Sequence, residues 1–356
     1  MPGGPYITPR ALMAGPGAAN AVAAGQAWPL LGTARAFAAI DVTTVQGAVV
    51  TALMTRPAYD TALICASPLT GSAMDQTLKT LGVAPPPFAG LDLTQPRIMG
   101  IVNVTPDSFS DGGAHPTAHT ALAHALKLAE EGADILDVGG ESTRPGAAPV
   151  APDDEQRRAI PVVRELANRG LCVSIDTRHP TTMAAAIQAG ARIVNDVTAL
   201  AHPDALPLIA RSNANVVLMH MQGEPQTMQD DPRYAWAPGD VFDMLGARVK
   251  ACIAAGIDRP RIAVDPGVGF GKTAAHSAQI LEHVALFHGL GCPVVIGASR
   301  KRFIAGLSRN EAVTDRLPGS LAAALAAVRS GAQIVRVHDV AATRQALAVQ
   351  QHLGFA

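Results

Sequence analysis

The sequence is poor in charged residues, and its charges are balanced. It contains 28 lysine and arginine residues against 29 acidic ones, a formal net charge of −1. Nucleic acids and anionic membranes favour partners with a basic surplus, so this balance supports neither. The N-terminus lacks the charged-then-apolar order of a signal peptide, and no apolar run reaches the roughly 18 residues of a membrane helix. We therefore expect a soluble, cytoplasmic protein.

Cysteine is also scarce. The four cysteines are far apart and none belongs to a CxxC pair, so the spacing suggests neither a disulfide framework nor a thiolate zinc site. We expect them to be buried as small apolar side chains in a reducing compartment. Hydrophobic residues are not scarce: they make up 48% of the 356 residues, enough for one large core and a smaller second unit. The cysteines are Cys65, Cys172, Cys252 and Cys292.

The composition changes near residue 90. Residues 85–87 are three consecutive prolines, which form a stiff, extended break, and Phe88–Pro96 resembles a connecting loop. We therefore predict a small accessory segment over residues 1–90, to which we assign no function, and a second domain over 91–356. The elements predicted within the first segment are two short strands and a helix: Phe37–Val42, Gly47–Val50 and Ala73–Leu81.

After residue 96, short β-branched runs alternate with longer amphipathic stretches, which is typical of βα units on a parallel sheet. Several predicted helices end at a glycine just before the next strand. Eight units in about 250 residues match the size of an α/β (β/α)8 TIM barrel. A doubly wound open sheet is the alternative, but it usually has fewer strands and a glycine-rich first turn. The predicted strands are Ile98–Val104, Ile135–Val138, Cys172–Ile175, Ile193–Val197, Val216–His220, Ile262–Asp265, Val294–Ala298 and Ile334–His338, and the helices include Thr120–Glu131, Asp153–Arg169, Thr181–Ala189, Val241–Ala255 and Ser320–Arg329.

Polar residues lie at the ends of all eight predicted strands. A barrel strand needs no polar side chain there for packing, and an unpaired buried charge costs several kcal/mol. The carboxyl ends of barrel strands build the active site, so the pattern indicates function. One or two of these residues could instead be helix N-caps, and Asp137 is the strongest candidate for such a structural role. The strand-end residues are Asn103, Asp137, Asp176, Asn195, His220, Asp265, Ser299, and Arg336 with His338.

Two loops and one misleading motif complete the pattern. The loops Thr105–Gly113 and Gly139–Gly146 are dense in Gly, Pro, Ser and Asp, a composition typical of a lid. The sequence Gly267–Thr273 ends like a P-loop, but the pattern needs a glycine where Pro266 stands. We therefore reject ATP binding there and expect Lys272 to be solvated or to support the site from behind.

Eight motifs together resemble the dihydropteroate synthase family. They occur in the family's order and span about residues 96–350, so the segment 1–90 lies outside the resemblance. Eight in order are far more specific than any one alone. The motifs are MGIVNVTPDSFSDGG (99–113), DVGGESTRPGA (137–147), SIDT (174–177), IVND (193–196), LMHMQGEPQTMQ (218–229), DPGVGFGKT (265–273), GASRK (297–301) and RVHDV (336–340).

The resemblance implies an enzyme that joins a pterin diphosphate to para-aminobenzoate. It implies a clamp on the polar edge of the pterin, with Met219 and Phe270 against the ring faces. Carboxylates, a carboxamide and a lysine complement the donors and acceptors of that edge. The alternative for Met219 and Phe270 is simple core packing. The implied clamp residues are Asp176, Asn195, Asp265 and Lys301.

The resemblance also implies a diphosphate site and a seat for the second substrate. Asn103 is similar to the family's Mg²⁺ ligand. Ser299, Thr143 and Pro145 are implied for para-aminobenzoate. Arg336 and His338 are two residues apart on one strand, so both can address one anion. The implied diphosphate set is Asn103, Thr143, Arg144, Arg336 and His338.

The implied chemistry is departure of pyrophosphate followed by attack of the aromatic amine. Asp107 or Asp111 could stabilise the pterin cation when the first loop closes, and Arg144 and Lys301 complete the catalytic set. Two other functions stay open. One is a methyltransferase that passes a methyl group from a folate to a corrinoid protein, and the other is a catalytically silent pterin-binding paralogue. The family is usually a homodimer, which we expect here.

Overall fold

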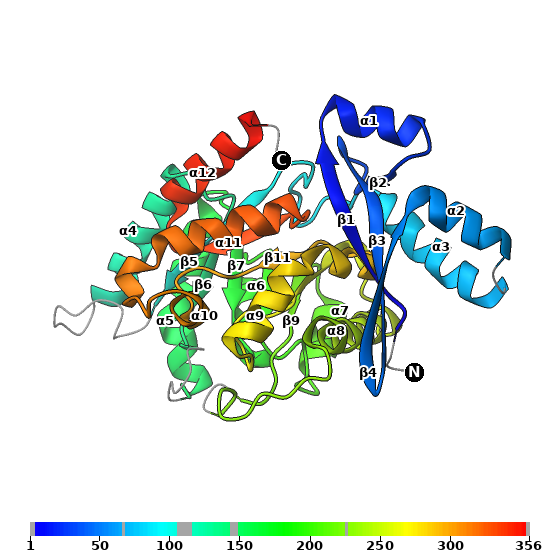
Figure 1. Cartoon of the computed structure of the whole chain (residues 1–356). Helices are drawn as coiled ribbons and strands as arrows, with labels where there is room; N and C mark the ends of the chain where they lie inside the picture. Colours follow the sequence, from blue (N-terminus) through cyan, green and yellow to red (C-terminus); the bar gives the residue numbers. More distant parts are fainter. Residues whose placement is uncertain (1–3, 66–67, 105–115, 143–148, 225–226, 354–356) are drawn as a thin grey trace.

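The computed structural model describes residues 4–65, 68–104, 116–142, 149–224 and 227–353 (Figure 1). Eight parallel strands form one sheet in the order β10-β9-β8-β7-β6-β5-β12-β11. A bridge between Val264 and Val294 joins the two ends of this order and closes the sheet into a barrel. The TIM-barrel prediction is confirmed. The strands are β5 Arg97–Asn103, β6 Ile135–Gly139, β7 Val173–Asp176, β8 Ile193–Asp196, β9 Asn215–Met219, β10 Ile262–Asp265, β11 Val295–Ile296 and β12 Ile334–Val337.

Helices surround the barrel, and their starts explain the largest errors in the predicted bounds. Prolines stand in the first turn of several of them, where a missing N–H costs nothing, and the prediction began some helices after those prolines. The predicted helix Val241–Ala255 thus starts at Ala237. The helices are α4 Pro116–Glu130, α5 Pro152–Asn168, α6 Pro180–Gln188, α7 Ala205–Arg211, α8 Ala237–Ala254, α9 Ala274–Glu282, α10 Arg302–Leu307, α11 Leu317–Arg329 and α12 Val340–His352, with 3-10 turns η2 Arg259–Arg261, η3 Val284–Leu290 and η4 Val313–Asp315.

The predicted connecting loop closes the floor of the barrel. Phe88 and Leu91 pair through two backbone hydrogen bonds, and Phe88 is fully buried. With Leu93 it packs against the first residues of the strands, including Met99 and Ile135. Phe88–Pro96 is therefore more than a connection, because it supplies the apolar plug at the amino ends of the strands.

The N-terminal segment forms a separate antiparallel sheet. Its long central strand, β3, pairs with all three others, and Trp28 stacks on Phe37 with ring centroids 5.3 Å apart. The predicted strand Phe37–Val42 lies inside β3, whereas Gly47–Val50 begins one residue before β4. The first strand was missed because a proline and an arginine interrupt its alternation. The elements are β1 Tyr6–Ala14, α1 Pro16–Ala23, β2 Trp28–Leu30, β3 Arg35–Gln46, β4 Ala48–Thr55, α2 Arg56–Cys65 and α3 Pro68–Gly82.

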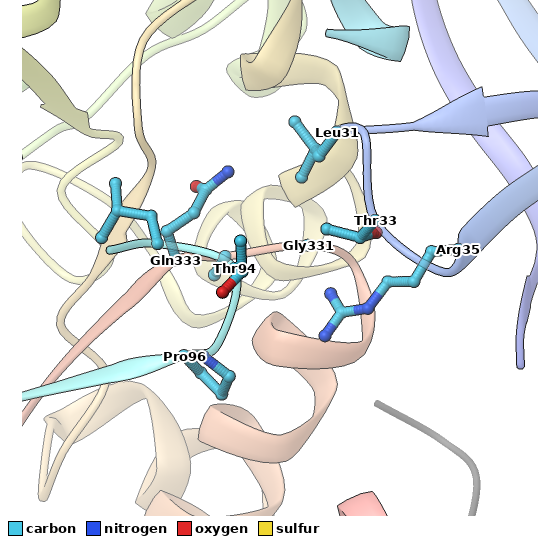
Figure 2. Close-up of a pocket in the computed structure, with 9 residues that line it drawn as sticks. Leu31, Thr33, Arg35, Thr94, Pro96, Gly331 and Gln333 are labelled. Carbon is cyan, nitrogen blue, oxygen red and sulfur yellow. The ribbon is translucent and has the colours of Figure 1, made fainter. Parts of the chain in front are cut away.

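This segment packs against the outside of the barrel. The Tyr6 hydroxyl donates to Asp243 at 2.7 Å, and its ring lies 5.3 Å from that of Trp236. Figure 2 shows Arg35 of the segment facing the barrel, where its guanidinium donates to the Val328 carbonyl at 3.0 Å. The cavity drawn there has about 10 Å³, which is room for a single water and no more. This cavity marks the contact between the N-terminal segment and the barrel, and it is too small for a substrate.

Candidate active site

The polar strand-end residues meet inside the barrel, at the carboxyl ends of the strands. Parallel strands place these ends on one rim, and Asp176, Asn195 and Asp265 are all buried there. Asp137 pairs with Ser174 in the strand register, while Asp176 pairs with Gly139. Asp137 therefore lies one inward-facing layer below Asp176, which explains why it is fully buried.

Arg336 is the centre of this cluster. Its Nε donates to Asp137 Oδ2 at 2.6 Å, and its Nη2 donates to Asp176 Oδ2 at 2.7 Å. Asn195 Nδ2 donates to the same Asp137 oxygen at 3.0 Å. One guanidinium thus holds two carboxylates from neighbouring strands, an arrangement that suits the fixed fork of arginine. The family resemblance implies a diphosphate role for Arg336, and the structure adds its pairing with two carboxylates.

Asp176 keeps one oxygen free for a ligand. Its Oδ1 is buried and has no hydrogen-bond partner among the described residues, and the same holds for Asp137 Oδ1. Burial raises the pKa of Asp176 to about 7, Arg336 opposes that rise, and Asp137 adds to it. A buried acceptor without a donor costs free energy. Asp176 Oδ1, at the rim, is therefore suited to an N–H group of a bound molecule.

Asp265 and Lys301 lie beside this cluster. Asp265 Oδ1 accepts from the Gly267 N–H at 2.7 Å. A Cβ on Gly297 would lie 3.7 Å from Asp265 Oδ2 and 3.8 Å from Lys301 Nζ, so the glycine leaves room between the two side chains. Burial lowers the pKa of Lys301 to about 8, against the opposing effect of Asp265. Burial also raises the pKa of Asp265, and Lys301 opposes it.

Apolar groups lie next to this cluster. Lys301 Nζ lies 4.3 Å from the centroid of the Phe270 ring, a cation–π distance. Met219 is buried at the end of β9, and its Cγ would lie 3.4 Å from a Cβ on Gly267. The two residues expected to hold a flat ring thus border the loop after β10. Their contact with a ring stays a prediction.

Ser299 and His338 form a pair, although the sequence placed them with different substrates. The Ser299 hydroxyl lies 3.1 Å from His338 Nδ1 and accepts from the His338 backbone N–H at 3.2 Å. Asn103 ends β5, half-buried, beside Gly139. Five further predicted residues lie outside the described ranges: Asp107, Asp111, Thr143, Arg144 and Pro145.

Two interpretations from the sequence need correction. Asp137 is no helix cap, since its carboxylate holds Arg336 and Asn195. Its position near a strand end, shared with the other residues of the cluster, was the sequence feature that could have indicated this role. Of the two alternatives for Lys272, solvation is wrong, because the residue is only 3% exposed and its Nζ lies 2.9 Å from His220 Nδ1. Support of the site from behind stays a prediction. Cys172, Cys252 and Cys292 are buried and unpaired, as expected.

A buried carboxylate behind Asp176 predicts how stability changes with pH. Glu155 Oε2 accepts from the Thr177 hydroxyl at 2.8 Å, and burial raises the pKa of Glu155 from 4.5 to about 7. Between these values the folded state binds the extra proton, so the free energy of unfolding falls as pH rises from about 4.5 to about 7. We expect Glu155→Gln to remove roughly 2–3 kcal/mol of that fall. Urea unfolding of both proteins at pH 5 and pH 8 checks this. An equal change in the free energy of unfolding between the two pH values in both proteins would contradict it.

Comparison with known proteins agrees with this geometry. The sequence matches the family of pterin binding enzymes over residues 99–338. It is 50% identical to the dihydropteroate synthase of Neisseria meningitidis serogroup B over 270 residues, which cover 74% of this chain and 95% of the relative. The structure resembles Xanthomonas albilineans dihydropteroate synthase with 4-aminobenzoic acid, at 51% identity and a TM-score of 0.71, covering 74% of this chain and 96% of that one. With 7,8-dihydropteroate, the Xanthomonas enzyme gives 48% identity and a TM-score of 0.68, covering 74% and 95%.

Among the residues described, none of the helices is both long and apolar enough to cross a lipid bilayer.

Proposed function

The chain belongs to the dihydropteroate synthase family, and we propose that its barrel condenses 6-hydroxymethyl-7,8-dihydropterin diphosphate with para-aminobenzoate. The products are 7,8-dihydropteroate and pyrophosphate. The C–O bond between the pterin methylene and the diphosphate breaks, with its electron pair leaving on pyrophosphate. The aromatic amine then forms the new C–N bond and loses a proton. This makes the protein a transferase of folate biosynthesis.

The observation that carries the proposal is the buried cluster of partnerless acceptors beside a lysine. Asp176 Oδ1 has no donor within the described chain, and Asp265 and Lys301 both lie beside Gly297. The amino-pyrimidinone edge of a pterin offers N–H donors and ring acceptors, which is the complementary set. Asn195 adds a group that both donates and accepts, while Met219 and Phe270 provide flat apolar contact.

The remaining roles are those that the family resemblance implies. Arg336 and His338, with Thr143 and Arg144, bind the diphosphate and spread the charge of the leaving group. Ser299, with Thr143 and Pro145, seats the carboxylate and ring of para-aminobenzoate. Asp107 or Asp111 of the first loop stabilises the cation left on the pterin methylene. The catalytic set is Asp107, Asp111, Arg144 and Lys301.

Mg²⁺ is the proposed cofactor, with Asn103 as its protein ligand. The described residues contain no group of three His, Cys, Asp or Glu side chains that could hold a metal ion. A single amide oxygen still fits Mg²⁺, which keeps several waters and is often bound through substrate phosphates. Asn103 is half-buried at the carboxyl end of β5, on the rim where the diphosphate would lie. When bound, the ion supplies positive charge that neutralises the diphosphate.

Removal of the metal tests this assignment. We expect a chelator to reduce turnover by about tenfold or more, because the charge on the leaving group is then less well neutralised. Binding of a pterin without diphosphate should be unchanged, since its clamp uses no metal. Isothermal titration of 6-hydroxymethylpterin with and without EDTA measures the second quantity. Loss of ring binding on chelation would contradict the placement at Asn103.

We also propose the biological setting. The protein acts as a homodimer in the cytoplasm, where the buried thiols of Cys172, Cys252 and Cys292 stay reduced. Residues 1–90 form an accessory unit, and residues 91–356 carry catalysis. Small-molecule substrates are its partners, with no nucleic acid and no membrane. Size-exclusion chromatography with light scattering tests the homodimer, and a mass of one chain at micromolar concentration would overturn it.

The reaction is tested by substrate dependence. Purified protein receives the pterin diphosphate, Mg²⁺ and para-aminobenzoate, and both pyrophosphate and dihydropteroate are followed. Product that requires both substrates is the expected result. Tight pterin binding without product would indicate the silent paralogue instead. Methyl transfer from a folate to a corrinoid protein would indicate the methyltransferase, but that function has no use for the residues proposed to bind diphosphate.

A further inference from the structure

Lys272 is a buried amine that the proposed reaction does not use. It stands in the P-loop-like sequence after β10, and it is 3% exposed. Three acceptors surround its Nζ: His220 Nδ1 at 2.9 Å, the Phe270 carbonyl at 3.0 Å and the His220 carbonyl at 3.5 Å. Burial lowers the pKa of Lys272 well below its usual value, and Asp265 opposes this. Burying an amine costs free energy, so its hydrogen bonds must offset that cost.

Those hydrogen bonds complete the support of one loop. Residues 268–271 present four consecutive backbone carbonyls, and a different side chain donates to each. Lys301 donates to Val268 and Gln229 to Gly269, while Lys272 donates to Phe270 and Tyr234 to Gly271. Side-chain donors to four successive carbonyls hold this loop in place from several directions.

The glycines of this loop show how close the fit is. Gly267 has φ +66°, and a Cβ there would lie 1.9 Å from the His220 carbonyl oxygen. Gly271 has φ +57°, and its Cβ would lie 2.5 Å from the Gln222 carbonyl oxygen. The loop therefore packs directly on the chain that follows β9, and Lys272 ties both segments together through His220 and Phe270.

We propose that Lys272 is a positioning residue for the pterin-ring pocket. It holds the loop 267–271 against His220, so that Phe270 and Lys301 keep the spacing that clamps a flat ring. This inference rests on the proposed function only in identifying the pocket's ligand as a pterin. Lys272 touches no substrate atom and takes no part in bond making. Its effect is therefore on affinity for the ring and not on the diphosphate or the second substrate.

The test compares Lys272→Met with wild type in the full-length protein. Methionine keeps the chain length and apolar stem but removes the three hydrogen bonds. We expect the Kd for 6-hydroxymethylpterin to rise about tenfold or more. The Kd for inorganic pyrophosphate with Mg²⁺ and the KM for para-aminobenzoate should stay within about twofold, because neither depends on this loop. Lys250→Met, at an exposed position of α8, is the matched control and should behave as wild type.

Two results would overturn the proposal. One is a folded Lys272→Met protein whose ring affinity equals that of wild type, with only its melting temperature lowered. The other is an equal loss of ring and pyrophosphate binding, which means general collapse of the site. If Lys272→Met does not fold, Tyr234→Phe decides, since it removes only the hydroxyl donor to Gly271. We expect a loss of about threefold in ring affinity there, and no change contradicts the proposal. A wild-type protein that fails to bind the ring would instead contradict the proposed function.

Discussion

Replacing Asp176 by alanine should weaken pterin binding by more than about tenfold, because a charged hydrogen-bond partner is worth roughly 1.5–3 kcal/mol. The substitution removes the free, buried Oδ1 and also one of the two carboxylates that hold Arg336. Asp265→Ala should cost a similar factor, since it removes the carboxylate beside Lys301. Isothermal titration with a diphosphate-free pterin measures both losses without involving the leaving group.

A control separates this effect from a change in fold. Asp204→Ala removes an exposed carboxylate just before α7, which pairs with the exposed His202 rather than with the buried cluster, and should leave the affinity unchanged. Wild-type affinity in Asp176→Ala or Asp265→Ala would contradict the assignment of that residue to the pterin site. Asp176→Asn adds a finer test, because it keeps the shape but replaces an acceptor oxygen by a donor. We expect it to bind less tightly than wild type.

Replacing Arg336 by alanine should have the larger effect on the protein as a whole. Its guanidinium lies between Asp137 and Asp176, and removal leaves two buried carboxylates facing each other. Breaking a buried ion pair by deleting one partner typically costs about 3–5 kcal/mol. We therefore expect lower stability together with loss of turnover by about 100-fold or more. Thermal unfolding and steady-state kinetics on the same preparation measure both.

The structure changes what this variant is expected to show. If Arg336 served the diphosphate alone, Arg336→Ala would bind a diphosphate-free pterin normally. Because Arg336 also orients Asp176, we expect ring affinity to fall as well. Arg169→Ala provides the matched comparison, since its ion pair with Glu165 is largely exposed. Surface pairs of that kind contribute about 0–1 kcal/mol, so its stability and activity should stay near wild type. Normal ring binding by a stable Arg336→Ala protein would contradict the role in orienting Asp176 and would leave Arg336 with the diphosphate alone.

The barrel could be predicted because its strands are short, β-branched and evenly spaced. The strand Ile262–Asp265 was placed to the residue, and the glycines after the helices marked the next strands. Phe88 could not be placed, because nothing local shows that an apolar residue in a proline-rich loop fills the barrel floor. The N-terminal strand β1 was missed because Pro9 and Arg10 interrupt its alternation, and its core partners lie in β3 and in the barrel.

The residues at the rim of the site could be predicted, but the contacts between their side chains could not. Strand-end position alone brought together Asp176, Asn195 and Asp265. That Arg336 holds Asp137 depends on the pairing of β12 with β5, the neighbour of β6, which brings together residues 199 positions apart in the sequence. The burial of Lys272 could not be predicted, because positive-φ glycines turn its loop inward, and hydrophobic periodicity does not show such a turn.

The most direct test of the account is a crystal structure of the protein with 6-hydroxymethylpterin. We predict that the ring lies at the carboxyl ends of the strands, with its amino-pyrimidinone N–H groups about 2.7–3.2 Å from the carboxylates of Asp176 and Asp265. Lys301 should contact the ring acceptors, and Phe270 should lie against one face. A ring bound elsewhere, or held at this rim without either carboxylate, would contradict the central claim that this cluster is the pterin site.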